Sequence, residues 1–365
     1  MPGKCLIVVD ARMHGHTGIG TFIRNLLPLL PGRIPTAQWA VLLPDSDHPE
    51  WLPPFFGVIT SPEPIYSIRE QITLPFRIPR NASLFWSPHY NIPWKLSCPL
   101  VSTVHDLNHL KRPPSLLRHP LRHLYPRLMF GRLARQSQEV LCVSRFTQDE
   151  FLEQYPGALN KTSHVANGVD ADWFNKPALP PARTKPYLLF VGTVRPHKNL
   201  KNLLLAFSRL PRPEKMDLVV AGPHSNFMSE DPEALALAHK LKASVHLTGE
   251  LQKSHLQALV HHAHALVFPS FYEGFGLPVL EALAAGCPVI CSDLPPLREI
   301  AGDLPLYFDP HSVEDILSKI EQLCLLQESS RSETIRRGIN RARTFNWNKT
   351  ADVYAGQFIR ILEQG

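Results

Sequence analysis

The sequence predicts an α/β protein with two doubly wound domains, each a parallel sheet with helices on both faces. Apolar stretches of strand length alternate with segments of helical periodicity, which is typical of parallel sheets. The chain has 365 residues, enough for two hydrophobic cores. A proline-rich segment, residues 176–186, interrupts the alternation and indicates a semi-rigid linker. We therefore expect a first domain over 1–175 and a second over 187–344.

Each expected element follows from a local pattern. The end of the chain, residues 345–365, has helical periodicity, with Tyr354, Phe358 and Ile361 on one face. The expected strands are Cys5–Asp10, Trp39–Leu43, Leu84–Trp86, Leu100–His105, Glu139–Val143, Tyr187–Val191, Asp217–Val220, Val245–Leu247, Ala265–Phe268 and Val289–Cys291.

Composition excludes several classes of protein. No apolar run approaches the roughly 20 residues of a membrane-spanning helix, and the N-terminus lacks the pattern of a signal peptide. Six cysteines without a CxxC pair indicate reduced thiols in a cytosolic protein. Nothing indicates nucleic-acid binding.

Basic residues are concentrated in one segment of the first half. The net charge is +6, and no acidic residue lies between Asp106 and Glu139. Leucines at 117, 121, 124 and 128 share one helical face there, although Pro126 interrupts the pattern. Such a segment favours a phosphate group or an anionic membrane surface, so residues 111–135 are a candidate membrane contact. Its basic residues are Lys111, Arg112, Arg118, Arg122, Arg127, Arg132 and Arg135.

The most informative segment is Phe268–Ile290. A strand runs through a loop containing Gly274 and Gly276 into a helix that begins near Leu277. Glu273 stands before the helix and Glu281 within it, eight residues later. A helix start behind a glycine-rich loop favours anion binding, because its free N–H groups and dipole face outward. Carboxylates beside such a site suit the hydroxyl groups of a sugar nucleotide.

This segment closely resembles the paired-glutamate signature of family 4 retaining glycosyltransferases, including its Ala-Ala-Gly-Cys-Pro-Val-Ile tail. The resemblance implies the GT-B fold, with two Rossmann-like domains facing across a deep cleft and the last helix crossing back to the first domain. It also implies that Glu273 contacts the donor sugar and Glu281 the ribose of the nucleotide.

A second glycine-rich loop follows the first expected strand. It contains Gly15, Gly18 and Gly20 and precedes an apolar helical pattern from Phe22. A dinucleotide dehydrogenase would place such a loop here, but the GxxGxG spacing does not match its GxGxxG fingerprint. Family 4 enzymes similarly place small residues beneath the donor phosphates, which suggests this role for Gly18 and Gly20; a plain tight turn is the alternative.

Two further segments supply candidate catalytic side chains. His105 and Asp106 end the strand in Val-His-Asp-Leu, a segment similar to that of family 4 mannosyltransferases, and would complete the sugar pocket. Lys198 follows a glycine turn and precedes a helix, where its charge would neutralise a leaving diphosphate. Thr193 stands where the family often has an arginine, and Arg195 is a weaker candidate. Relatives hold the nucleotide base at the loop matching Gly249-Glu250-Leu251.

The resemblance therefore implies a retaining, metal-independent transfer of a hexose from a nucleotide donor to a hydroxyl of a glycan or lipid-linked acceptor, in cell-envelope polysaccharide synthesis. GDP-mannose is the expected donor, and a UDP-hexose is the alternative. A nucleotide-sugar epimerase and an inactive scaffold stay open as other classes. No cofactor or metal is expected, and the location would be cytoplasmic, at the inner face of the membrane. The implied donor-binding residues are Gly18, Gly20, Thr193, Arg195, Lys198, Gly249, Glu250, Leu251, Glu273, Gly274, Phe275, Gly276, Leu277 and Glu281.

Overall fold

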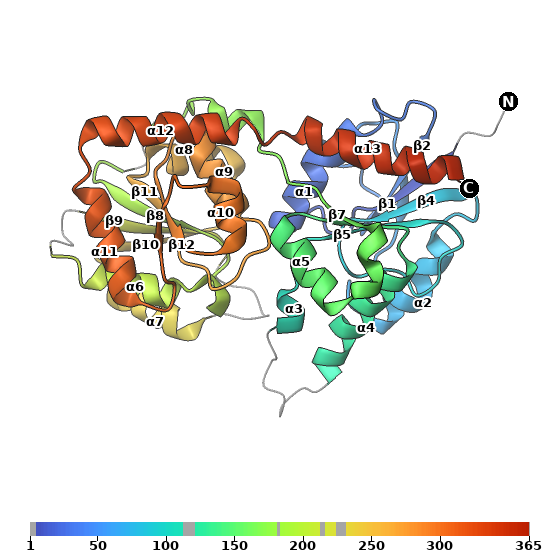
Figure 1. Ribbon diagram of the computed structural model, residues 1–365, viewed down its shortest axis with the longest axis horizontal. Helices are drawn as coiled ribbons and strands as arrows, with labels where there is room; N and C mark the ends of the chain where they lie inside the picture. Colours follow the sequence, from blue (N-terminus) through green and yellow to red (C-terminus); the bar gives the residue numbers. More distant parts are fainter. Residues whose placement is uncertain (1–4, 112–120, 181–182, 212–215, 224–230, 365) are drawn as a thin grey trace. The chain divides into compact units, whose positions relative to one another are not determined.

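The chain divides into two compact units (Figure 1). Unit 1 comprises Met1–Gly168 and Asn346–Gly365, and unit 2 comprises Val169–Phe345. The computed structural model describes residues 5–111, 121–180, 183–211, 216–223 and 231–364, without the side chains of 121–123.

Unit 1 is built on a parallel sheet. Seven strands are found in its described residues, in the order β3-β2-β1-β4-β5-β6-β7. Its inner strands β1 and β5 are buried along almost their whole length, as a sheet covered by helices on both sides requires. The strands are β1 (Leu6–Asp10), β2 (Gln38–Leu43), β3 (Gly57–Thr60), β4 (Ala82–Ser87), β5 (Leu100–Val104), β6 (Glu139–Cys142) and β7 (Thr162–His164).

Helices follow the strands in the alternation that the sequence predicts. Those described in unit 1 are α1 (Gly18–Leu26), η1 (Leu27–Leu29), α2 (Ile68–Arg77), α3 (Asn108–Lys111), α4 (Leu121–Gln136), α5 (Arg145–Gln154), η2 (Pro156–Lys161) and α13 (Trp347–Gln364).

The last helix, α13, packs against the sheet of unit 1. The Tyr354 hydroxyl lies 2.9 Å from Thr103 Oγ1 of β5, and the Phe358 ring lies 5.6 Å from Trp86 of β4. The backbone at Trp347 passes so close to Gly168 that a Cβ at this glycine would lie 2.2 Å from the Trp347 nitrogen. The apolar face predicted for this helix is therefore buried in the core of unit 1.

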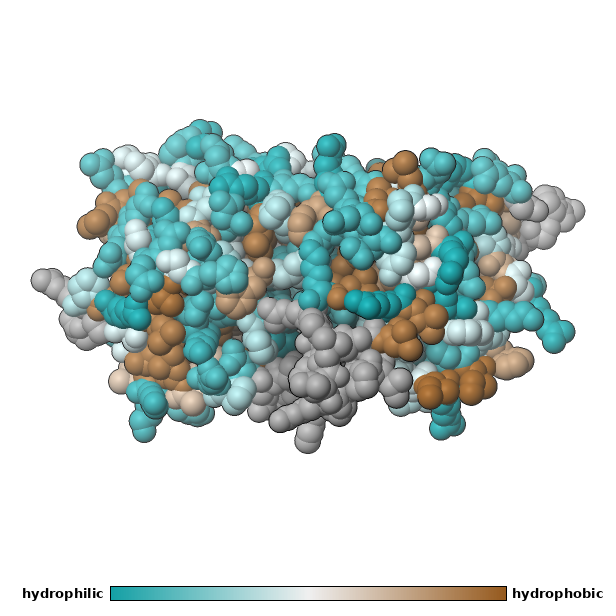
Figure 2. Space-filling view, turned by 60° about the horizontal axis from the view of Figure 1, so that its bottom comes forward, coloured by the Kyte–Doolittle hydropathy of each residue, from teal (hydrophilic) through white to brown (hydrophobic). Residues whose placement is uncertain are grey.

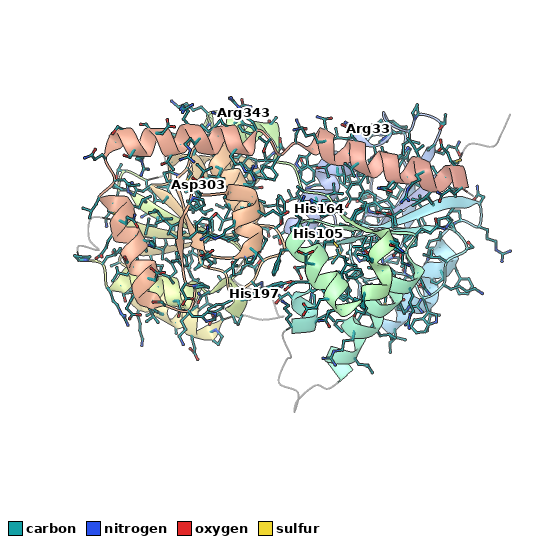
Figure 3. All side chains as sticks on the ribbon, viewed as in Figure 1. Arg33, His105, His164, His197, Asp303 and Arg343 are labelled. Carbon is teal, nitrogen blue, oxygen red and sulfur yellow. The ribbon has the colours of Figure 1, made fainter. Side chains whose placement is uncertain are left out.

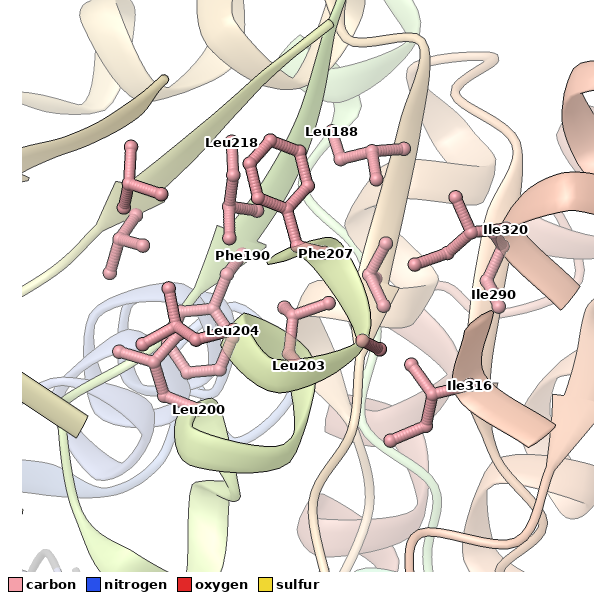
Figure 4. Packing of buried hydrophobic residues seen from close by; sticks show 14 of the residues in the cluster. Leu188, Phe190, Leu200, Leu203, Leu204, Phe207, Leu218, Ile290, Ile316 and Ile320 are labelled. Atoms are coloured by element: carbon pink, nitrogen blue, oxygen red, sulfur yellow. The ribbon is translucent and has the colours of Figure 1, made fainter. Parts of the chain in front are cut away.

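Unit 2 has a second parallel sheet. Its described strands number six, in the order β10-β9-β8-β11-β12-β13. The core between this sheet and helices α6 and α11 contains Leu188, Phe190, Leu203, Phe207 and Ile316 (Figure 4). The strands are β8 (Tyr187–Val191), β9 (Asp217–Ala221), β10 (Val245–Gly249), β11 (Ala265–Phe268), β12 (Val289–Ser292) and β13 (Leu306–Phe308). The helices are η3 (Ala171–Phe174), η4 (Pro196–Lys198), α6 (Leu200–Ser208), α7 (Pro232–Lys240), α8 (Lys253–His262), α9 (Leu277–Ala284), α10 (Pro295–Ala301), α11 (Val313–Cys324) and α12 (Glu328–Ala342).

The division between the units falls earlier than the expected linker. Residues 169–175, expected in the first domain, belong to unit 2, because η3 packs on α9 and Asp172 pairs with Lys253 at 3.0 Å. The proline-rich segment also lies within unit 2. Its Arg183 and Lys185 both pair with Asp217 at 2.8 Å, so ion pairs fasten its described end to β9.

Candidate functional site

Three glycines form the backbone at one end of the second sheet. Gly192, Gly222 and Gly249 end or follow β8, β9 and β10, and their amide and carbonyl groups continue the strand pairing, with the Gly222 nitrogen 2.9 Å from the Gly249 oxygen. Gly222 has φ of 137°, and a Cβ there would lie 2.3 Å from the Gly192 oxygen. This edge is therefore bare backbone, which a ligand can approach closely.

Lys198 and Glu273 form an ion pair at the same edge. Lys198 Nζ lies 2.6 Å from Glu273 Oε1, and both side chains are only partly exposed. Lys198 follows β8 and Glu273 follows β11. These strands are neighbours in the sheet although β9 and β10 lie between them in the sequence. The pair thus lies where the strand order reverses, the position at which open α/β sheets bind their ligands.

Asn199 fixes the loops that present this pair. Its side-chain amide donates to the backbone oxygens of Pro269 and Pro310, at 2.9 and 2.8 Å, and its backbone is left-handed, with φ of 57°. The Phe271 amide also donates to the backbone oxygen of His197, which is labelled in Figure 3. Sequence reasoning missed Asn199, although an asparagine directly before an apolar helical run is a signal for a special backbone position.

The helix α9 begins at a glycine whose backbone conformation other residues rarely adopt. Gly276 has φ of 107°, and a Cβ there would lie 2.4 Å from Leu297 Cδ2. Gly274 is buried, whereas Leu277 in the first turn is partly exposed. Phe275, predicted to bind the donor, has its ring buried against Phe345, with the ring centroids 6.3 Å apart.

Glu281 lies on α9, surrounded by protein but retaining some exposed surface. Burial raises its pKa to about 8; the positive charge of Lys253 opposes this shift and the charge of Asp170 adds to it. Lys253 itself pairs with Asp170 and Asp172. Lys253 was not singled out in the sequence, because a lysine at the start of a helix after a loop has no distinctive pattern.

The remaining residues predicted to bind the donor lie on the loops at the same carboxyl end of the second sheet. Thr193, Gly249 and Leu251 are partly exposed, and Arg195 and Glu250 are exposed. All five follow or end β8 or β10, the strands on either side of β9.

In unit 1, His105 and Asp106 follow β5, but their described hydrogen bonds point to different partners. His105 Nε2 lies 2.9 Å from the Pro88 oxygen, and the imidazole packs on the Phe22 ring at 4.9 Å. Burial lowers the pKa of His105 to about 4, against the effects of Pro88 and Asp106, so the imidazole is neutral at pH 7. Asp106 accepts a hydrogen bond from the Asn108 amide at 2.9 Å.

The glycine-rich loop after β1 differs from its prediction. Helix α1 begins at Gly18 rather than near Phe22, so Gly18 and Gly20 both lie in its first turn. Gly20 is required by packing, because a Cβ there would lie 2.4 Å from the His14 oxygen, whereas Gly18 is exposed with no atom near its missing Cβ.

A buried ionic network, which the sequence did not reveal, lies beside this loop. Arg12 donates to Asp10 and to Glu70, with both Nη2–oxygen distances 2.6 Å, and His89 contacts Asp10 at 3.2 Å. Burial opposes ionisation of Asp10, but its ion pair and hydrogen bonds with Arg12 hold its pKa well below the usual range. Glu70 also accepts the backbone amide of Tyr66 at 2.7 Å, which fixes that residue with φ of 67°.

No cluster of side chains suitable for a metal ion is found within the described part of the chain.

Comparison with known proteins decides the family. Residues 53–173 match the model named Glycosyltransferase Family 4, and residues 171–341 match Glycosyl transferases group 1. The O-antigen chain mannosyltransferase B of Escherichia coli is 30% identical over 285 residues, covering 72% of this chain and 71% of the relative. The chain belongs to glycosyltransferase family 4.

Solved structures show the fold of this glycosyltransferase. Sucrose-phosphate synthase of Thermosynechococcus elongatus superposes with a TM-score of 0.79 at 20% identity, covering 99% of both chains. The Anabaena protein HepE, crystallised with UDP and glucose, superposes with a TM-score of 0.74 at 16% identity, covering 97% of this chain and 99% of HepE. The two parallel α/β units are thus those of the GT-B fold.

Proposed function

We propose that this glycosyltransferase transfers mannose from GDP-mannose, with retention and without a metal ion, to a hydroxyl of a glycan or lipid-linked acceptor. It would act in cell-envelope polysaccharide synthesis, in the cytoplasm at the inner face of the membrane. The observation that supports this most strongly is the Lys198–Glu273 pair at the strand-order reversal, followed directly by the start of α9. The name of the Escherichia coli relative and the Val-His-Asp-Leu segment favour mannose.

The diphosphate of the donor would compete for Lys198. In the ligand-free protein, the ammonium group is neutralised by Glu273 at 2.6 Å. A diphosphate carries more negative charge than one carboxylate, so it would attract Lys198 and release Glu273 to accept hydrogen bonds from sugar hydroxyls. The open end of α9 would add its dipole as charge develops on the departing phosphate.

The nucleotide ribose would lie against Glu281. Its raised pKa means that this side chain is largely protonated at pH 7 without ligand. Ribose hydroxyls donating to the carboxylate, with Lys253 nearby, would favour its ionised form. From unit 1, the neutral imidazole of His105 and the carboxylate of Asp106 are proposed to hydrogen-bond the transferred sugar.

A UDP-hexose is the second candidate donor. Backbone groups at Gly249–Leu251 would contact the base, and backbone contacts do not discriminate strongly between bases. The superposition with HepE, a protein crystallised with UDP and glucose, favours keeping this candidate.

Direct donor turnover tests the proposal. The protein would be incubated in EDTA with GDP-mannose, UDP-glucose or UDP-galactose and a panel of octyl glycosides as acceptors. We expect GDP release and a mannosylated product whose one-bond coupling between the anomeric carbon and its proton shows the α configuration of the donor. Transfer only from UDP-sugars would overturn the mannose assignment, and a free isomer without product would indicate an epimerase. An inverted product, or activity only with added metal, would contradict the mechanism.

A further inference from the structure

Helix α2 exposes a row of large apolar side chains. Ile68, Ile72 and Phe76 are spaced four residues apart and are 81%, 61% and 87% exposed. The opposite side of the same helix is well buried, through Glu70 and Leu74. The exposure is therefore not a consequence of a loosely packed helix. Single exposed apolar residues are common on protein surfaces, but an aligned row indicates a contact surface.

The apolar surface extends to helix α4. The two helices are adjacent, because Gln71 Nε2 of α2 donates to the Tyr125 hydroxyl of α4 at 3.3 Å. On α4, Leu124 is 61% exposed and Leu128 is also exposed. Where the lower part of unit 1 comes forward, Figure 2 shows hydrophobic groups exposed among hydrophilic ones. We call these five apolar residues of α2 and α4 the α2–α4 face.

The charges around the α2–α4 face have one sign. On the described parts of both helices, the exposed charged side chains are Arg69, Arg77, Arg127 and Arg135, and the buried Glu70 pairs with Arg12. Arg77 pairs with the buried Glu63 at 3.2 Å, so the positive charge of the face comes from Arg69, Arg127 and Arg135. Exposed apolar side chains and arginines on the same two helices match the boundary of a bilayer with anionic headgroups. A second copy of the same face would meet it with arginines against arginines, which disfavours self-association.

The α2–α4 face coincides only in part with the membrane contact expected at residues 111–135, because α4 lies in that segment and α2 does not. Arg112 and Arg118 lie outside the described residues, as does the side chain of Arg122. Arg132 is not free for lipid, because it is buried, donates to the backbone oxygen of Trp94 and lies over the Trp94 ring at 3.9 Å.

We propose that the α2–α4 face docks unit 1 on an anionic lipid bilayer, with Ile68, Ile72 and Phe76 inserted at the headgroup boundary and the arginines on lipid phosphates. None of the helices in the described residues is long and apolar enough to cross a bilayer, so the contact is interfacial. This inference does not depend on the identity of the donor.

Sedimentation with vesicles tests this proposal. Wild-type protein would be mixed with vesicles of phosphatidylcholine alone or with a third of phosphatidylglycerol. The variants are Ile68→Ser/Ile72→Ser/Phe76→Ser and Arg69→Ser/Arg127→Ser/Arg135→Ser. Leu325→Ser is the matched control, because Leu325 is 82% exposed but lies in unit 2. Thermal unfolding of each variant would verify folding.

We expect wild type and Leu325→Ser to bind the anionic vesicles equally, and each triple variant to bind at least about tenfold more weakly. High salt should weaken wild-type binding but have little further effect on the arginine variant. Equal binding by wild type and the apolar variant would overturn the proposal. So would absence of wild-type binding, or a protein dimer in light scattering that the apolar variant abolishes.

Discussion

At the scale of residues, the function proposed for the second unit depends on the exchange of partners at Lys198. The pair with Glu273 keeps two charges in place beside the bare backbone of Gly192 and Gly222. A partly buried ion pair contributes little net stability, since desolvation offsets much of the attraction. Its position at the carboxyl end of the second sheet is better explained by function, because it keeps Lys198 and Glu273 in place for the donor.

Replacing Glu273 by Gln should separate catalysis from stability. The amide keeps the shape but loses the charge that holds Lys198 and the sugar, so we expect transfer to fall on the order of 100-fold. The melting temperature should change by only a few degrees. Initial rates with saturating donor would measure this. Glu314→Gln is a control, because Glu314 is in an exposed ion pair with Arg209; unchanged transfer in the Glu273 variant would contradict the assignment.

Glu281 predicts a pH dependence of stability in the absence of ligand. Its folded pKa of about 8 exceeds the ordinary glutamate value, because burial penalises the ionised carboxylate. The contribution of Glu281 to the free energy of unfolding is therefore fully present at low pH and is lost as the pH rises toward 8. Glu281→Gln should therefore melt higher than wild type at pH 9, by about 2 °C or more, and show a smaller difference at pH 5. Melting curves across pH 5–9 would test this, and parallel curves would refute it.

The sequence revealed those site residues that stand close together in the chain. Glu273 and Glu281 stand in one unbroken segment, so their spacing was visible. Asn199 binds Pro269 and Pro310, and Arg12 binds Glu70, across long stretches of chain that only the fold brings together. Nothing local distinguishes such residues, because their importance lies in partners rather than in a pattern.

At the scale of elements, the predicted strands are those with buried apolar runs, and the structure confirms all ten with shifts at their ends. The missed strands, β3, β7 and β13, each lie at an edge of a sheet. An edge strand has one neighbour and is short and partly exposed, as Gly57–Thr60 illustrates, where no residue is fully buried. Its sequence therefore lacks the continuous apolar signal of an inner strand.

The start of α9 gives a prediction at this scale. Gly276→Ala adds a methyl group against Leu297 at a backbone angle that alanine disfavours, so unfolding should become easier by about 2–5 kcal/mol. Gly302→Ala is the matched control, because Gly302 has φ of 62° but no atom within 4 Å of the added Cβ. We expect about 1–2 kcal/mol there. Equal losses in denaturant titrations would show that the contact with Leu297 has no role.

At the scale of the whole molecule, the last helix belongs to the unit that begins the chain. Arg33, labelled in Figure 3, pairs with Asp352 of α13, and Thr350 donates to the Ala166 oxygen at 2.8 Å. The first and last segments of the sequence thus complete one core. The stability of unit 1 depends on a helix that lies far along the sequence from all of its strands.

Phe358→Ala should destabilise unit 1 selectively. The side chain is fully buried beside Trp86 and Tyr354, so its loss should cost about 3–5 kcal/mol. Hydrogen exchange should report faster opening of β1, β4 and β5, with β8 and β11 unchanged. Faster exchange in both units alike would show that they unfold as one.

Calorimetric titration of GDP, in EDTA, into wild type, Lys198→Ala and Glu281→Ala is the most direct test of the nucleotide site in unit 2. We expect wild type to bind GDP more tightly than UDP, and each variant to bind GDP at least about tenfold more weakly while melting as a folded protein. Equal binding of GDP by all three proteins, or binding of neither GDP nor UDP by wild type, would contradict a nucleotide site at Lys198 and Glu281; binding of UDP alone would keep the site and replace the donor.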